Sequence, residues 1–213
     1  MPLDQFEAAR GGAERIRTFA AKGGRFTDLL NERDLTAAMI AIIGGPEAVK
    51  AFAEAGGRFT DQQNKYGHTA AMEVMWHSAE TIKAFVEAGG RFTDQQDRYG
   101  NTAAMYACWQ SPEIIQAFGE AGGRFTDHQN KEGMTAGMYA VQSGGSPAIK
   151  AFANAGGRFT DQEDEGGWTA AMYAGRGDAD TIRAFAEVTR CNLRQSQRPS
   201  SAPLAKPNSP TAP

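Results

Sequence analysis

The hexapeptide GGRFTD occurs five times in this chain of 213 residues. The copies occupy residues 23–28, 56–61, 89–94, 122–127 and 156–161, and successive copies are 33, 33, 33 and 34 residues apart. A catalytic site is usually built once, so recurrence at a fixed spacing indicates architecture. A period of roughly 20–50 residues is the sequence signature of a stacked repeat array.

One repeat shows where the helices are expected. Residues 64–67, NKYG, have turn chemistry because Gly67 accepts the positive φ that other residues resist. Thr69 is a good N-cap for a first helix that we expect to run to about His77. A second helix is expected to start at Ser78. Its apolar stripe, at the helical spacing i, i+3 and i+4, consists of Ile82, Phe85 and Val86.

The hexapeptide is interpreted as the joint between units. In the third copy, Gly89 is a natural left-handed C-cap that ends the helix, and Phe92 is expected to fill the seam with the next unit. A single helix pair cannot bury its apolar face alone, so neighbouring pairs must stack. The pattern therefore predicts an all-α solenoid of about six stacked helix pairs with projecting hairpin loops.

The chain resembles ankyrin-repeat proteins over about residues 1–190. The motifs YGHTAAM, YGNTAAM, EGMTAGM and GGWTAAM resemble the family's G-x-T-P-L-H core, and KAFVEAGGRF resembles its helix ending. Alanine replaces the family's proline at Ala37, Ala70, Ala103, Ala136 and Ala170. Methionine replaces its histidine at Met39, Met72, Met105, Met138 and Met172. In the family that histidine hydrogen-bonds backbone between units, so methionine packing is expected to take its place here.

The units differ along the chain, which predicts its organisation. We expect an N-terminal capping helix pair in residues 1–30 and four ankyrin-like repeats in 31–163, because end units of a solenoid are atypical. A C-terminal capping repeat is expected in 164–194, and a disordered Pro/Ser-rich tail in 195–213. Asp34 stands where later units carry glycine, and an extra glycine in SGGSP accounts for the spacing of 34.

Composition and charge restrict the classes of partner. The chain is 41% hydrophobic and 22% charged, as folded globular proteins are. Residues 190–213 carry three Arg, one Lys and no acid, so the net charge of −3 leaves −7 for residues 1–189. An acidic array is a poor match for phosphate backbones, so no nucleic-acid partner is expected. No apolar run approaches the ~20 residues of a membrane span, and the first residues do not resemble a secretory signal.

No motif for catalysis or cofactor binding was found. Cys108 and Cys191 lack the spacing of a zinc site or a disulfide framework. The three histidines, His68, His77 and His128, have no metal-ligand spacing, and no phosphate-binding glycine motif occurs. A protein that is not an enzyme and has no cofactor or metal is therefore expected, with an enzyme or enzyme subunit as the alternative.

The informative positions in a repeat array are those that vary while their neighbours stay constant. The residue before each recurring threonine is expected to project from a hairpin tip, and a second variable set lies near the end of each first helix. The resemblance implies that these two sets line a concave, partner-binding face. The predicted partner-binding residues are Tyr66, His68, Trp76, His77, Tyr99, Asn101, Trp109, Gln110, Met134 and Trp168.

Aromatic residues dominate the centre of this set. Tyr66, Trp76, Tyr99 and Trp109 are expected to neighbour each other across two units, and tyrosine and tryptophan are enriched in binding hot spots. The alternative is that the tryptophans only cover helix ends.

Two recurring sets are interpreted as structural. Partly buried spacers between helices are predicted at Tyr106, Tyr139 and Tyr173. A row of ion pairs, each with the aspartate three residues later, is predicted at Arg25, Arg58, Arg91, Arg124 and Arg158.

These observations favour a protein-protein interaction module that binds a partner of unknown identity on its concave face, in the cytoplasm. The alternative is a bacterial effector or regulator delivered to another cell, such as a host cell, with the basic tail as its export signal. The tail also contains PxxP spacings at Pro207, Pro210 and Pro213, which are typical of polyproline ligands.

Overall fold

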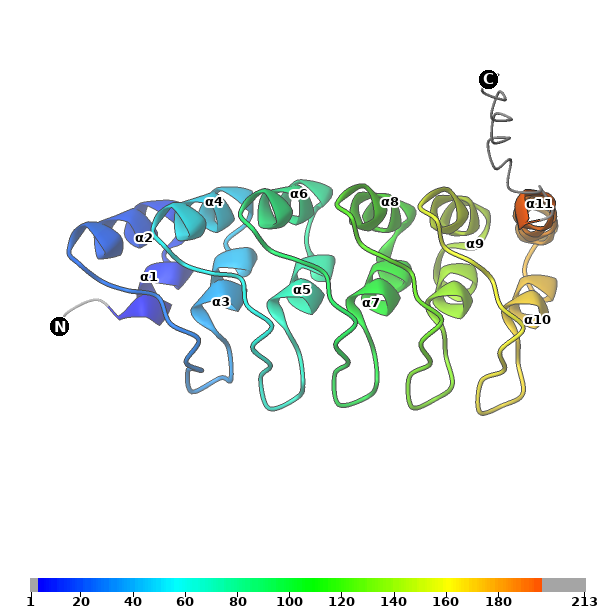
Figure 1. Ribbon diagram of the computed structural model, residues 1–213, viewed down its shortest axis with the longest axis horizontal. Coiled ribbons are helices and arrows are strands. Elements are labelled where there is room, and N and C mark those ends of the chain that lie inside the picture. Colours follow the sequence, from blue (N-terminus) through cyan, green and yellow to red (C-terminus); the bar gives the residue numbers. More distant parts are fainter. Residues whose placement is uncertain (1–3, 197–213) are drawn as a thin grey trace, which may run out of the picture.

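The computed structural model describes the backbone of residues 4–196 and the side chains of residues 4–190. Six helix pairs stack side by side, and no strand occurs within residues 4–196. The second helices of the pairs form one layer, the first helices form the layer beneath it, and the hairpin loops project beyond the first helices (Figure 1). The predicted all-α solenoid is confirmed.

The helices alternate regularly along the chain. The first helices are α1 (Gln5–Arg10), α3 (Ala37–Ile43), α5 (Ala70–Glu73) with the 3-10 turn η1 (Val74–Trp76), α7 (Ala103–Gln110) and α10 (Ala170–Gly175). The second helices are α2 (Gly12–Ala21), α4 (Pro46–Glu54), α6 (Ala79–Glu87), α8 (Pro112–Glu120) and α11 (Ala179–Ser196). Helix α9 (Ala136–Asn154) contains both helices of its pair, separated by non-helical backbone at Gly145 (φ 52°, ψ −142°).

Threonine caps explain where the first helices begin. The Thr69 hydroxyl accepts a hydrogen bond from the Met72 amide at 3.3 Å, which satisfies one of the free amides of the first turn. The same bond recurs in the other units at Thr36, Thr102, Thr135 and Thr169. The first helix of the third unit was predicted to reach His77, and it ends as a 3-10 turn at Trp76.

The glycine pair of the hexapeptide closes the second helix of the first five units. Gly89 has φ 88°, and its amide bonds to the Val86 carbonyl while the Gly90 amide bonds to the Phe85 carbonyl, both at 2.9 Å. This is the Schellman arrangement predicted for a left-handed C-cap. The second position requires glycine for a different reason, because a Cβ at Gly90 would lie 2.5 Å from the ring of Phe85. Both glycines are therefore required.

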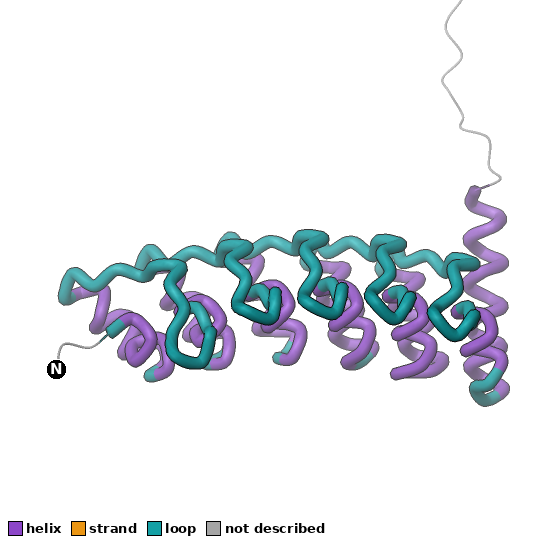
Figure 2. The backbone as a smooth tube through the Cα atoms, turned by 90° about the horizontal axis from the view of Figure 1, so that it is seen from below, coloured by secondary structure: helices purple, strands orange, loops and turns teal. Residues whose placement is uncertain are grey.

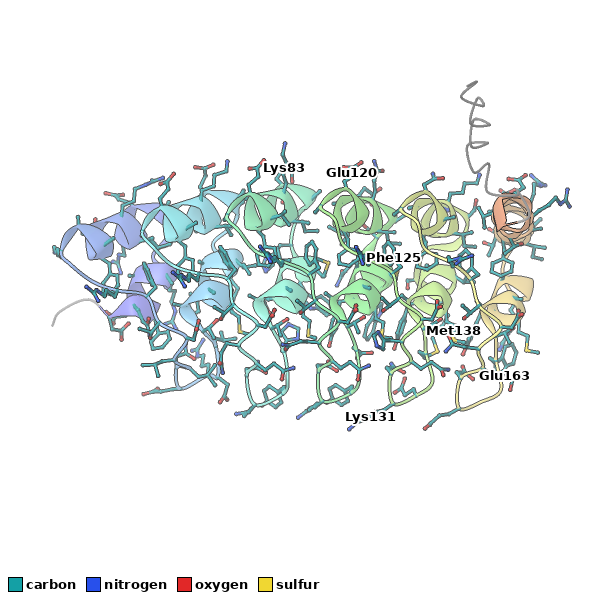
Figure 3. All side chains as sticks on the ribbon, in the orientation of Figure 1. Lys83, Glu120, Phe125, Lys131, Met138 and Glu163 are labelled. Atoms are coloured by element: carbon teal, nitrogen blue, oxygen red, sulfur yellow. The ribbon has the colours of Figure 1, made fainter. Side chains whose placement is uncertain are left out.

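Phenylalanines form an unbroken row between the layers. Phe85 of a second helix contacts Phe59 of the preceding joint and Phe92 of the following joint, with ring centroids 5.1 and 5.5 Å apart. Equivalent pairs, at 4.7–5.2 Å, continue the row from Phe19 to Phe185. Figure 3 shows Phe125 between the two layers, whereas Lys83 and Glu120 project outward from the second helices. The predicted role of phenylalanine in the seam is confirmed.

Methionine packing also behaves as expected. Met39, Met72, Met105 and Met138 are buried, so they fill the space between units. Met172 is half-exposed because no further unit follows α10.

Successive hairpins are joined by backbone hydrogen bonds. The amides of Arg98, Lys131 and Glu165 donate to carbonyls of the preceding hairpin at 2.8, 2.9 and 3.0 Å. The first hairpin differs, because Asp34 occupies the left-handed region (φ 59°) and forms an ion pair with Lys65 of the next hairpin. Figure 2 shows the loops aligned along one side of the array.

The predicted arginine ion pairs are wrong. The five arginines of the hexapeptides are exposed, and none takes part in an ion pair within the described side chains. The joint aspartates are used differently: Asp28 accepts from the Thr60 hydroxyl at 2.8 Å, and Asp61 accepts from Thr93 at 3.2 Å. The joints are therefore bridged between units by neutral donors.

The last helix is longer than predicted. Helix α11 continues to Ser196, so the predicted tail overlaps its last residues, and residues 197–213 lie outside the described part. Over residues 4–196, none of the helices has the length and apolar composition of a membrane span.

Candidate functional site

Aromatic side chains from three units meet on the hairpin side of the array. Trp76 lies against Tyr106, with centroids 5.7 Å apart, and against Trp109, at 6.3 Å. Trp109 stacks on Tyr139 at 5.6 Å and an interplanar angle of 11°. His68 contacts the ring of Tyr106 edge-on at 5.5 Å. We call these five residues, His68, Trp76, Tyr106, Trp109 and Tyr139, the aromatic strip.

The two tryptophans are the exposed part of the strip. Trp76 and Trp109 are each 51% exposed, whereas Tyr106 is buried and Tyr139 is half-buried. Each tryptophan thus rests on a tyrosine of the following unit and keeps about half of its surface free. Trp76 and Trp109 of adjacent units therefore lie next to each other, as predicted.

Hydrogen bonds fix the tyrosines beneath them. The Tyr106 hydroxyl donates to the Asp97 carboxylate at 2.5 Å, and the Tyr139 hydroxyl accepts from the Asn130 amide at 2.9 Å. Burial, with the Asp97 contact second, raises the pKa of Tyr106 well above its usual value, and burial also raises the pKa of Tyr139. Both phenols therefore stay neutral. The prediction of partly buried spacers is confirmed for Tyr139 and Tyr173, whereas Tyr106 is buried.

A carboxylate flanked by two histidines lies beside the strip. Glu73 Oε2 is 3.3 Å from His68 Nε2, and Glu73 Oε1 is 3.5 Å from His77 Nε2. The His77 Nε2 atom is buried without a properly aligned hydrogen bond, so the second contact is electrostatic. Burial opposes ionisation of Glu73, but the two histidines outweigh it and lower the pKa of Glu73 to about 2. The glutamate is therefore ionised at neutral pH.

A second exposed cluster lies at the hairpin tips. The guanidinium carbon of Arg98 is 4.5 Å from the ring centroids of both Tyr66 and Tyr99, and Lys65 Nζ is 5.0 Å from the Tyr66 ring. The predicted meeting of Tyr66 and Tyr99 thus occurs through an arginine. We call Tyr66, Arg98 and Tyr99 the tip cluster. In Figure 3, Lys131 marks the tip of the following hairpin.

The last unit repeats this chemistry on its own. Trp168 contacts Tyr173 at 5.5 Å, and the Arg176 guanidinium lies 5.1 Å from the Trp168 ring. The hydrogen bond from the Tyr173 hydroxyl to Asp164 raises the pKa of Tyr173 to about 12.

Two predicted binding residues do not project. Asn101 and Met134 are buried, 7% and 5% exposed, so the expectation that this turn position reaches solvent is wrong for both. Asn101 accepts from the Asn130 side chain of the next unit at 2.8 Å. Met134 lies under the Tyr173 hydroxyl of the unit after it. Both residues join units. Gln110 is half-buried at the end of α7.

The predicted binding residues did not include five residues of the site and its surroundings: Glu73, Asp97, Arg98, Tyr106 and Tyr139. The two tyrosines were interpreted as structural spacers. Glu73 occupies the position that Tyr106 and Tyr139 hold in the next units, immediately after the recurring methionine. The other units carry apolar or aromatic residues there, including Ile40, so a charged residue at this position was a signal that could have identified it. Arg98 carried no such signal, because its contacts depend on how two hairpins align.

The other candidates for a chemical site are metal-ligating side chains and the buried cysteine. Within residues 4–190, no group of three or more His, Cys, Asp or Glu side chains is arranged to hold a metal ion. Burial raises the pKa of Cys108 well above its usual value, so this thiol is protonated.

Comparisons with known proteins identify the fold. No protein-family model matches the chain, and no curated protein matches it. Among solved structures, an ankyrin-repeat protein aligns with a TM-score of 0.70 and 18% identity over 91% of this chain and 98% of that chain. The ankyrin-repeat domain of Bcl-3, a member of the IkappaB family, aligns at 0.69 and 22% identity over 88% and 86%.

A third match comes from the structure of a predatory endopeptidase of Bdellovibrio bacteriovorus in complex with immunity protein Bd3460. It has a TM-score of 0.65 and 19% identity over 86% of this chain and 96% of that chain. The likeness at these identities concerns the fold, and the array has the ankyrin-repeat fold.

Proposed function

We propose that the chain is a non-enzymatic scaffold that binds a partner protein on the aromatic strip and the neighbouring tip cluster. The observation that carries this proposal is the half-exposed pair Trp76 and Trp109, which rests on two hydrogen-bonded tyrosines. A contiguous exposed aromatic surface marks an interaction site on a soluble protein, since apolar surface in water is unfavourable.

Rigidity strengthens the argument for binding. The rings are held by helices, by the phenol hydrogen bonds and by each other, so little side-chain entropy remains to be lost when a partner binds. Tyrosine, tryptophan and arginine are also the residues most enriched among interface hot spots. The matched structure that contains an endopeptidase and its immunity protein is a protein-protein complex, which supports the same class of function.

The proposal is tested by affinity capture with three full-length proteins: the native chain, a Trp76→Ala/Trp109→Ala variant and an Ile182→Ala control. Ile182 is 46% exposed on α11, so its removal deletes a similar kind of apolar surface away from the strip. Loss of hot-spot aromatics typically weakens binding by about thirtyfold. A partner captured by the native and control proteins and lost by the double variant supports the proposal. Equal capture by all three folded proteins would contradict it.

Each part of the array also has a role in this proposal. We assign the helix pair α1–α2 and the last pair α10–α11 as caps of the array, and residues 31–163 as the repeats that carry the strip. The effector alternative depends on a tail that lies mainly outside the described residues. Deletion of residues 197–213, followed by a translocation assay, tests it.

A further inference from the structure

Three aromatic rings at the hairpins, the exposed Tyr66 and Tyr99 and the half-buried Trp168, already have arginine on their faces. Arg98 covers both Tyr66 and Tyr99, and Arg176 covers Trp168. A cation over an aromatic face is attracted by the ring quadrupole, and tryptophan is the strongest partner. Within the described side chains, Trp76 and Trp109 have no such cation, although each is 51% exposed.

The backs of these two rings are occupied and their remaining surface is free. Trp76 lies against Tyr106, Trp109 is stacked on Tyr139, and the two indoles are inclined by 56° with centroids 6.3 Å apart. At this separation the two indoles contact each other, so they form one continuous exposed aromatic surface. A planar guanidinium can lie against the exposed part of one ring and remain within the ~6 Å over which such attraction acts.

Carboxylates lie beside the rings that support the two tryptophans. Glu73 is ionised beside His68, which touches Tyr106, and Asp97 accepts the Tyr106 hydroxyl. Burial is the main cause of the raised pKa of Tyr139, the ring beneath Trp109, and the negative charges of Glu132 and Asp97 raise this pKa further. No lysine or arginine forms an ion pair with these three carboxylates among the described side chains. Glu73 is paired with two histidines, and Asp97 accepts three neutral donors. The chain therefore places no lysine or arginine against these carboxylates among the described side chains.

The long-range field has the same sign. Residues 1–189 carry a net charge of −7 once the basic residues after position 189 are set apart. Such a field steers basic partners toward the surface and repels acidic ones.

We infer that the exposed surface of the Trp76–Trp109 pair receives an arginine side chain from a basic segment of the partner protein. This inference rests on the proposed function and specifies the partner's chemistry. The guanidinium takes the place at the two tryptophans that Arg98 takes at Tyr66 and Tyr99 and Arg176 takes at Trp168. The carboxylates beside the supporting rings and the net negative charge of residues 1–189 favour its positive charge.

The test uses fluorescently labelled hexaarginine and a hexacitrulline peptide, which has nearly the same shape but no charge. Binding to the full-length protein is followed by fluorescence anisotropy at low salt. Hexaarginine is expected to bind the native protein and the Ile182→Ala control equally. The Trp76→Ala/Trp109→Ala variant is expected to bind it about tenfold more weakly, as loss of two cation–π contacts implies. Hexacitrulline is expected to bind none of them.

Three outcomes overturn the inference. The first is that hexaarginine does not bind at concentrations up to about 1 mM, which is near the weakest specific affinities. The second is that the native and double-variant proteins bind hexaarginine with equal affinity. The third is that hexaarginine and hexacitrulline bind equally. Circular dichroism of the double variant excludes unfolding as the cause of a loss. If lysate capture still depends on the two tryptophans while hexaarginine fails, protein binding stands and only the arginine inference falls.

Discussion

The hydroxyl of Tyr106 lies 2.5 Å from the carboxylate of Asp97. Asp97 begins a hairpin and also accepts the backbone amides of Tyr99 and Asn101, each at 2.8 Å. One buried carboxylate therefore shapes the hairpin and ties it to helix α7, which carries Trp109. The surface that we propose for binding is built on the bonds that hold the hairpin in place.

Replacing Tyr106 with phenylalanine is expected to destabilise the protein by about 1.5–3 kcal/mol, because a buried charged acceptor loses a donor. Chemical denaturation measures this loss. A double-mutant cycle with Asp97→Asn separates the hydrogen bond from changes in packing. A coupling energy near zero between the two positions would contradict a stabilising hydrogen bond.

The joint glycines are expected to resist substitution for two different reasons. Gly90→Ala places a methyl group 2.5 Å from the Phe85 ring, and such overpacking costs about 1–3 kcal/mol. Gly89→Ala forces φ 88° on a residue with a Cβ and costs about 1 kcal/mol or more. Gly175→Ala in α10 is the matched control, since no atom lies within 4 Å of the position that its methyl group would occupy. It is expected to be neutral or stabilising in thermal unfolding, and a loss equal to that of Gly90→Ala would be inconsistent with the steric explanation.

The phenylalanine row is expected to be most sensitive at its centre. Phe85 is 1% exposed and contacts a ring on each side, so Phe85→Ala should cost about 3–5 kcal/mol. Phe185 ends the row, is half-buried and contacts only Phe159 within it. Urea denaturation of Phe185→Ala should show a clearly smaller loss, and equal losses would mean that the row does not act as a continuous core.

The stability of the folded protein is expected to depend on the ionisation of Glu73 at acid pH. The pKa of this carboxyl in the folded protein is about 2, and that of an unperturbed glutamate is about 4.3. The stabilisation is therefore fully present above pH ~4.3 and is lost as the pH falls through ~2. It amounts to at most about 3 kcal/mol.

Comparison with Glu73→Gln isolates this effect from other carboxylates. The difference in unfolding free energy between the native protein and the variant, measured by denaturant titration, should shrink as the pH falls from about 5 to 2. A difference that stays constant over this range would show that the two histidines do not stabilise the Glu73 carboxylate.

The exposed arginines of the joints are expected to contribute little to stability. Arg91 is exposed and forms no ion pair with a described side chain. Arg91→Gln should change the unfolding free energy by no more than about 0.5 kcal/mol. A loss above about 1 kcal/mol in thermal or urea unfolding would restore the ion-pair interpretation of the repeated Arg–Asp spacing.

Features that depend on residues close in sequence were predictable. The threonine caps, the left-handed joint glycines such as Gly89 and the helix pairs follow from spacings of one to five residues. The caps and the joint glycines each recur in five of the six units. Repetition also predicted stacking, because an apolar stripe such as Ile82 and Phe85 needs a neighbour that a lone helix pair cannot provide. The sequence by itself therefore determined the fold class and placed Trp76 and Trp109 on one side of adjacent units.

Only the tertiary structure decided what those side chains touch. Asn101 varies like a binding residue, but Asn130 of the next unit covers it. Arg98 joins Tyr66 and Tyr99 because two hairpins align through a backbone hydrogen bond between units. Exposure and ring contact depend on the offset between stacked units, which arises from packing summed over the interface. No local spacing in the sequence encodes that offset.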